Sequence, residues 1–206
     1  MDLKATVKKY IAQRKNSMKR VMITFPEARQ STNFSCGAAS VQAVLYYYGM
    51  DVREDVIIEE LDVKPTSIVH TGVDPDVIKK SLESIWGLKV DMKEMTIKDV
   101  KSYIDKEIPV ILAIQAWNDN YLTEKGVHDY SKSYNDGHYV VAIGYNENTM
   151  YFDDPSILDN HGYISFNELN NRWHDKDDHG HKLEHLGLAV YGKPHNFNPD
   201  ELKKIK

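Results

Sequence analysis

The feature that most restricts the fold is an apolar segment, PVILAIQAW, at residues 109–117. It is rich in β-branched side chains, which favour extended backbone, and it predicts a buried central strand. Two later segments, HYVVAIGY and TMYFDD, are separated only by NEN and predict a hairpin with strands near 138–145 and 149–153. A last strand is expected near 186–191. Because short turns join antiparallel strands, this half of the chain predicts an antiparallel sheet.

The first half of the chain is mainly helical by its pattern. Residues 35–49 carry apolar side chains at intervals of three and four, which is typical of a helix with a buried stripe. Ser35 is the expected N-cap of this helix, and Gly49 is its expected C-terminal glycine. Further helices are predicted at 53–61, 71–87, 97–104 and 166–174. Helices first and antiparallel strands later are typical of an α+β fold.

Length and charge restrict the function classes. The 206 residues suit one domain at 21–206 preceded by a basic arm at 1–20, which we read as a weakly packed extension or as a membrane-surface or partner helix. The net charge of −5 argues against a nucleic-acid partner or an anionic membrane. No segment approaches the roughly 20 apolar residues of a membrane span. A single cysteine without a signal peptide predicts a cytoplasmic protein.

The single cysteine, Cys36, lies at the predicted start of the helix at 35–49. Unpaired N–H groups and the helix dipole stabilise a negative charge there, so the first turn favours a reactive thiolate. We expect such a thiol to be partly exposed. The alternative is a structural cysteine, since cysteines are among the most buried residues.

Three polar residues complete a candidate site around Cys36. His138 opens an apolar strand and is the candidate base. If the hairpin turn is centred on residue 146, Asp154 faces His138 across the ladder; a shift by one residue favours Asp153, and spacing alone leaves both open. Gln30, six residues before Cys36, is a candidate side-chain donor to an oxyanion, together with the Cys36 N–H.

This combination resembles the papain-like cysteine peptidases. Within them it is most similar to the double-glycine leader peptidase-like family, the type that processes bacteriocins. The resemblance rests on Q-x5-C-G-x-A from Gln30, the helix end YYYG, the strand GHYVVAIGY and the motif DDP, and it extends over about residues 26–192. Residues 1–20 and 118–137 are not part of the shared pattern, so the resemblance does not extend to the substrate.

The resemblance implies a papain-like fold in which N-terminal helices pack on an antiparallel sheet. It implies that Cys36 is the nucleophile, His138 the base, Asp154 rather than Asp153 the orienting acid, and Gln30 an oxyanion donor. It implies a peptide or protein substrate, and neither a metal nor an organic cofactor.

Three functions are compatible with this site. The first is a thiol hydrolase that cleaves a peptide or isopeptide bond through an acyl-enzyme. The second is an acyltransferase, in which an amine or thiol replaces water. The third is a non-catalytic module that binds a peptide with the tyrosine-containing polar loop at 118–137. We expect this loop to border the active-site cleft and to make few buried apolar contacts, because it leads directly to His138.

A second polar cluster, RWHDKDDHGHKLEH, contains the histidines of residues 174–185. His179 and His181 with a carboxylate are candidate ligands of a divalent metal. The alternative, which the pattern favours, is a solvated loop between a helix and a strand, because no ligand pair lies at i and i+4 on a predicted helix.

Overall fold

The computed structural model describes residues 20–67, 70–117, 129–158, 161–177, 179–202 and 204. The predicted N-terminal arm, apart from Arg20, therefore lies outside the described residues. So does the first part of the predicted polar loop, residues 118–128.

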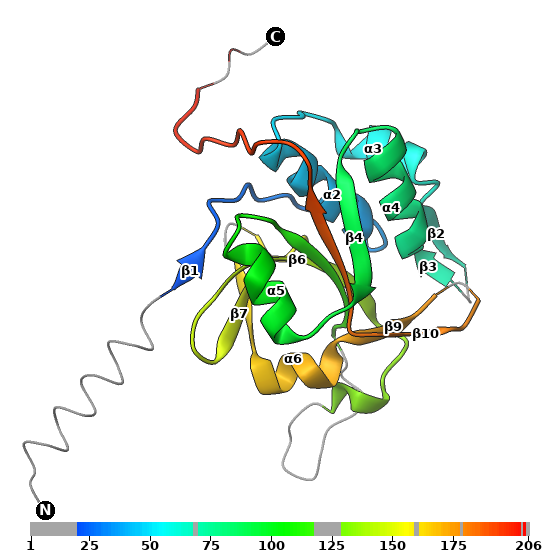
Figure 1. The fold of residues 1–206 in the computed structure, drawn as a ribbon. Helices are drawn as coiled ribbons and strands as arrows, with labels where there is room; N and C mark the ends of the chain where they lie inside the picture. Colours follow the sequence, from blue (N-terminus) through cyan, green and yellow to red (C-terminus); the bar gives the residue numbers. More distant parts are fainter. Residues whose placement is uncertain are drawn as a thin grey trace, which may run out of the picture.

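A seven-stranded sheet forms the centre of the fold (Figure 1). Its path runs through β4 (Lys89–Glu94), β11 (Leu186–Tyr191), β5 (Val110–Gln115), β6 (Gly137–Tyr145), β7 (Thr149–Asp153) and β8 (Gly162–Ser165). The short strand β1 (Val21–Met22) pairs with β6 beyond Ala142, where the ladder between β5 and β6 ends. Every strand pair in the sheet is antiparallel, which confirms the predicted α+β class.

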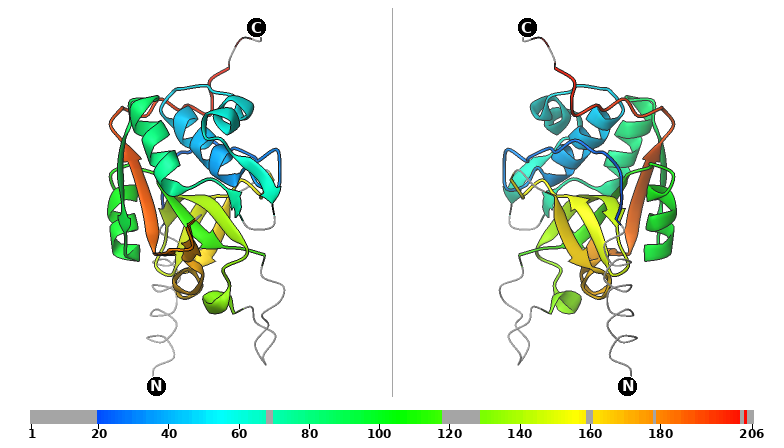
Figure 2. Two further views of the ribbon diagram at one scale, coloured as in Figure 1. Left: turned by 90° about the vertical axis from the view of Figure 1, so that its right-hand side faces the viewer. Right: turned by 90° about the vertical axis from the view of Figure 1, so that its left-hand side faces the viewer.

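Helices lie on both faces of this sheet. They are α2 (Cys36–Tyr47), α3 (Glu54–Glu60), α4 (Pro75–Ser84), α5 (Ile97–Ile104) and α6 (Phe166–Arg172). Figures 1 and 2 show α2 on one face and α5 on the other. After α2, Gly49 closes the helix as predicted, because its φ of 79° lets Met50 N–H bond to the Leu45 carbonyl at 2.9 Å.

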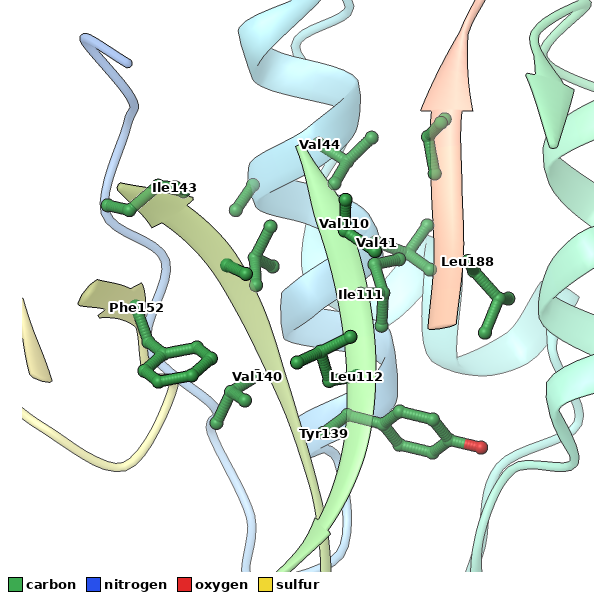
Figure 3. Close-up of a cluster of buried hydrophobic side chains, with 14 of the residues drawn as sticks. Val41, Val44, Val110, Ile111, Leu112, Tyr139, Val140, Ile143, Phe152 and Leu188 are labelled. Atoms are coloured by element: carbon green, nitrogen blue, oxygen red, sulfur yellow. The ribbon is translucent and has the colours of Figure 1, made fainter. Parts of the chain in front are cut away.

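The helix α2 is buried almost all round rather than along one stripe. Val41 and Val44 face β5, where Val110 and Ile111 lie (Figure 3). On another side, the first turn of α2 contains Gly37, which has no side chain. A Cβ added there would lie 2.5 Å from Val73 Cγ1 and 3.2 Å from the Tyr139 ring. The N-terminal end of α2 is therefore held closely against the beginning of β6.

The predicted helix at 71–87 is wrong at its start. Residues 71 and 72 belong to β3 (His70–Gly72), which pairs with β2 (Lys64–Ser67). The helix begins at Pro75, because the Asp74 carboxylate accepts the Asp76 N–H at 2.8 Å and proline suits the first helical position.

The predicted solvated loop at 174–185 is also wrong. Its residues form a hairpin of β9 (His174–Lys176) and β10 (Lys182–Glu184). Asp177 stabilises the turn, because its Oδ1 accepts the N–H groups of His179 at 2.9 Å and His181 at 2.7 Å.

The pairing of β1 with β6 requires a glycine. A Cβ at Gly144 would lie 2.7 Å from the Val21 carbonyl oxygen, and backbone cannot yield as a flexible side chain can. We expect Gly144→Ala to lower the free energy of unfolding by about 1–3 kcal/mol, measured by urea denaturation. The control, Tyr163→Thr on β8, changes a side chain that is 75% exposed and should shift stability by less than about 0.5 kcal/mol. Equal stability of Gly144→Ala and the wild type would contradict this close approach.

Candidate active site

Cys36 is the first residue of α2, as the sequence predicts. Ser35 occupies the N-cap position, but its side chain makes no capping bond; its Oγ accepts the Thr32 N–H at 3.2 Å instead. Helices α4, α5 and α6 each have a side-chain cap. The cap side chain therefore does not occupy the N–H groups in the first turn of α2, the turn that contains Cys36.

The thiol is more buried than expected. Cys36 is 7% exposed and belongs to the cluster of buried apolar residues, so the prediction of a partly exposed cysteine is wrong. Its neighbour Gly37 lies between Val73 and Tyr139, and this packing covers the start of the helix.

His138 lies next to both Cys36 and Asp154. Its Nε2 is 2.7 Å from Asp154 Oδ1, and the residue is only 2% exposed. Burial works to lower the pKa of this imidazole, but the interactions with Asp154 and with Cys36 outweigh it and raise the pKa to about 9. The charged imidazolium is therefore the favoured form at neutral pH.

Asp154 has two structural roles. Its Oδ1 also accepts the N–H and the hydroxyl of Ser156, at 2.9 Å and 2.7 Å, so the residue begins a turn as well as contacting His138. Burial works to raise the pKa of this carboxyl, but hydrogen bonds from His138 and Ser156 outweigh it and hold the pKa below its usual value. Asp154 is thus an anion beside the imidazolium.

The contact between His138 and Asp154 does not arise from the predicted register. Val141 faces Asp153, and the register shifts between Ala142 and Gly144. Continuing this register would place Asp154 opposite residue 140, two positions from His138. Because side chains alternate with a period of two, a shift by two residues keeps the same face, and the contact becomes diagonal.

Asp153 points to a different environment. It is buried, and its carboxylate accepts the backbone N–H of Ala28. Burial, together with the charges of Glu27 and Asp154, raises its pKa to about 8. Asp154, and not Asp153, is therefore the carboxyl within hydrogen-bonding distance of His138.

Gln30 belongs to a segment that is fastened to the Asp154 turn. The Gln30 N–H donates to the Pro155 carbonyl at 3.1 Å, and Arg29 Nη1 donates to the Ser156 carbonyl at 3.3 Å. The Gln30 side chain donates one N–H to the Thr32 carbonyl at 2.6 Å, which leaves a second amide hydrogen. The chain that precedes Cys36 is thus held in place by the chain that follows β7.

Sequence reasoning missed a buried polar network behind β6. Gln115 donates to Asp175 Oδ1 at 3.0 Å and accepts the Asp136 N–H at 3.3 Å. A Cβ at Gly137 would lie 2.4 Å from Asp175 Oδ2, so a larger residue directly before His138 would displace the Asp175 carboxylate. No periodicity marks these residues, because β9 meets β5 and β6 only in the tertiary structure.

The described part of the predicted loop, residues 129–137, is anchored rather than loosely packed. Ser133 is buried, and its carbonyl accepts a hydrogen bond from His174 Nε2 at 2.8 Å. This anchoring is polar, and no residue of 129–137 belongs to the cluster of buried apolar residues, so the expectation of few buried apolar contacts holds for this part. At the other end of the loop, the Trp117 ring centroid is 4.5 Å from that of His138, a contact that the sequence did not indicate.

The candidate metal ligands stabilise the β9–β10 turn. His181 Nδ1 lies 2.8 Å from Asp177 Oδ2, and the rings of His179 and His181 are 6.0 Å apart. In the part of the chain that the structure describes, which omits Asp178, no three His, Cys, Asp or Glu side chains are arranged to hold a metal ion.

The two adjacent carboxyls predict opposite pH dependence of stability. Because the folded-state pKa of Asp153 lies above its unfolded value, its contribution to stability is present at acidic pH and is lost as the pH rises toward about 8. Asp153→Asn is neutral at every pH. Its free energy of unfolding relative to wild type should therefore increase by a few kcal/mol between about pH 4 and about pH 8, measured by urea denaturation.

The matched control is Asp154→Asn. The pKa of Asp154 is lowered on folding, so its contribution to stability is present above the unfolded pKa and is lost as the pH falls. This variant should lose stability relative to wild type at neutral pH. The same pH trend in both variants would contradict the assignment of the two carboxyls.

A family model matches most of the chain. The model of the Peptidase_C39 like family covers residues 22–179. Comparison with curated proteins gives no match. None of the described helices is both long and apolar enough to cross a membrane.

Three solved structures share the fold. The first is a double glycine motif protease from an AMS/PCAT transporter in complex with the leader peptide (20% identity, 82% of this chain and 93% of that one, TM-score 0.55). The second is described as a C39-like peptidase from Bacillus anthracis (15% identity, 86% of this chain and 100% of that one, TM-score 0.62). The third is the peptidase domain of Streptococcus ComA, a bi-functional ABC transporter (16% identity, 81% and 97%, TM-score 0.56). With its antiparallel sheet and its helices, the chain has the papain-like peptidase fold and belongs to the Peptidase_C39 like family.

Proposed function

We propose that this chain is a cysteine peptidase, a thiol hydrolase that cleaves a peptide or isopeptide bond with Cys36, His138 and Asp154. One observation carries the proposal: the buried imidazole of His138 contacts the partly buried carboxylate of Asp154 and lies beside Cys36, the only thiol of the chain. Membership of a peptidase-like family supports it. Location in a reducing cytoplasm stays a prediction.

The geometry suits acyl transfer to sulfur. The Cys36 thiolate attacks the substrate carbonyl, and the oxyanion accepts hydrogen bonds from the Cys36 N–H and from the free amide hydrogen of Gln30. The His138 imidazolium then gives its proton to the leaving amine as the carbon–nitrogen bond breaks, leaving a thioester. Water attacks the thioester while His138 accepts its proton, and the acid is released. Asp154 holds the imidazole in orientation throughout.

A peptide substrate is supported by the structural neighbour that has a leader peptide bound. Two alternatives use the same residues in other ways. An acyltransferase would pass the acyl group from Cys36 to an amine or thiol, and a binding module would hold a peptide without cleaving it. The ionic pair of His138 and Asp154 beside the thiol favours a reaction at Cys36 over binding alone, because peptide binding does not require it.

The first test of the proposal measures the reactivity of Cys36. Because the imidazolium of His138 stabilises the thiolate, we expect iodoacetamide to alkylate Cys36 well below neutral pH, measured by mass spectrometry. His138→Ala should slow this labelling strongly. The matched control, His179→Ala in the β9–β10 turn, should leave it unchanged. A thiol that reacts only above about pH 8 and ignores His138→Ala would be structural.

The second test measures hydrolysis of a peptide library. Cys36→Ser should abolish cleavage, and Gln30→Ala should lower its rate by about 10²–10³ if the amide is an oxyanion donor. Cleavage should decline as the pH rises through about 9, because His138 then loses the proton that the leaving amine needs.

The products distinguish the alternatives. An acyl-amine product that replaces the acid when an amine is added would identify an acyltransferase. Tight binding of peptides by wild type and Cys36→Ser alike, with no cleavage by either, would identify a binding module and contradict the proposal.

A further inference from the structure

Trp117 is an exposed aromatic side chain in direct contact with the candidate base. It is 52% exposed, and its ring is tilted by 56° against the ring of His138 with the centroids 4.5 Å apart. The backbone directly before it is fixed on two sides. Ala116 N–H donates to the Asp136 carbonyl at 2.8 Å, and Arg172 Nε donates to the Gln115 carbonyl at 2.7 Å. The indole is therefore presented from a rigid position.

The backbone of Trp117 is strained for a large residue. Its φ of 48° is in the left-handed region, which glycine adopts far more easily than tryptophan. Asp62 and Glu107 share this conformation, but each follows a helix, where it commonly closes the helix end. His185 also shares it after the strand β10, but its ring stacks on that of Trp173 with the centroids 5.0 Å apart. Trp117 follows a strand as well, yet it is 52% exposed, so burial does not explain a tryptophan at this position. Strain of this kind concentrates at functional sites.

The chemistry of the proposed reaction defines what lies beside Trp117. His138 must reach the nitrogen of the leaving amine to protonate it. The residue that follows the scissile bond is attached to that nitrogen, so it lies over His138. The indole of Trp117 is an exposed apolar group in contact with that histidine. Ile157, whose N–H donates to the Asp154 carbonyl at 3.0 Å, is also exposed, so the turn after Asp154 carries an apolar side chain as well.

We propose that Trp117 binds the substrate residue on the C-terminal side of the scissile bond and selects an apolar or aromatic side chain there. This inference rests on the proposed peptidase function and adds the specificity of the same site. Burial of the exposed indole against an apolar side chain supplies the selectivity, because a charged or absent side chain leaves that surface in water. In an apolar pocket, the presence or absence of a small apolar group on the substrate changes kcat/KM by about 10- to 200-fold.

The experiment uses one cleaved peptide from the library and varies only the residue after the cut among Gly, Leu, Phe, Glu and Lys. The wild type should favour Phe and Leu over Gly, Glu and Lys in kcat/KM by about tenfold or more. Trp117→Gly should reduce this ratio by about tenfold while the melting temperature stays equal or rises, because glycine relieves the backbone strain. Trp117→Phe should restore most of the ratio. Ile85→Ala, an exposed apolar control at the end of α4, should leave it unchanged.

Three outcomes would overturn the inference. A wild type that cleaves all five peptides equally would show that the residue after the cut is not selected. An equal loss of kcat/KM for every peptide in Trp117→Gly, with a shifted pH profile, would make Trp117 a positioning residue for His138. Failure of the wild type to cleave any library peptide would reject the peptidase function, and this inference with it, whereas the first two outcomes reject only the inference and leave the peptidase function intact.

Discussion

The pairing of β6 with its neighbours is the constraint on which the rest of the structure depends. This strand pairs with β5 up to Ala142, with β1 at Gly144 and Tyr145, and with β7 on its other side. It is also packed against α2 on one face and α5 on the other (Figures 1 and 2). A strand held on two edges and two faces cannot shift without loss of hydrogen bonds and apolar burial. Its first side chains, including His138, are therefore fixed in space.

The candidate site forms where three elements end. Cys36 begins α2, His138 stands at the start of β6, and Asp154 follows β7. Each terminus leaves polar groups that the element itself does not satisfy, and the side chains at these termini interact with one another. The bonds from Ala28, Arg29 and Gln30 to the turn after β7 join two of these termini. Rigid elements thus place one candidate side chain at each of these termini.

Buried polar groups are concentrated around this site at a cost in stability. Asp153 is held largely in its neutral form by burial, and Gln115 and Asp175 hydrogen bond behind Gly137. An apolar interior at these positions would avoid the desolvation of such groups. Their arrangement instead holds the chain on both sides of His138. The positive φ of Trp117 also costs stability, and it too occurs beside the candidate site.

The sequence by itself determined the helix α2, the strands β5, β6, β7 and β11, and most of the candidate residues, but not the hairpins β2–β3 and β9–β10. Side-chain periodicity, β-branched runs and Gly49 predicted α2 and the strands β5, β6, β7 and β11, because these signals act over a few neighbouring residues. Only the tertiary structure decided the register between β6 and β7, since the irregularity near Gly144 accompanies its pairing with the distant β1. The choice between Asp153 and Asp154, the network of Gln115 and the contact of Trp117 likewise depend on segments far apart in the chain. Local patterns specify what each segment forms, and packing between segments specifies which side chains meet.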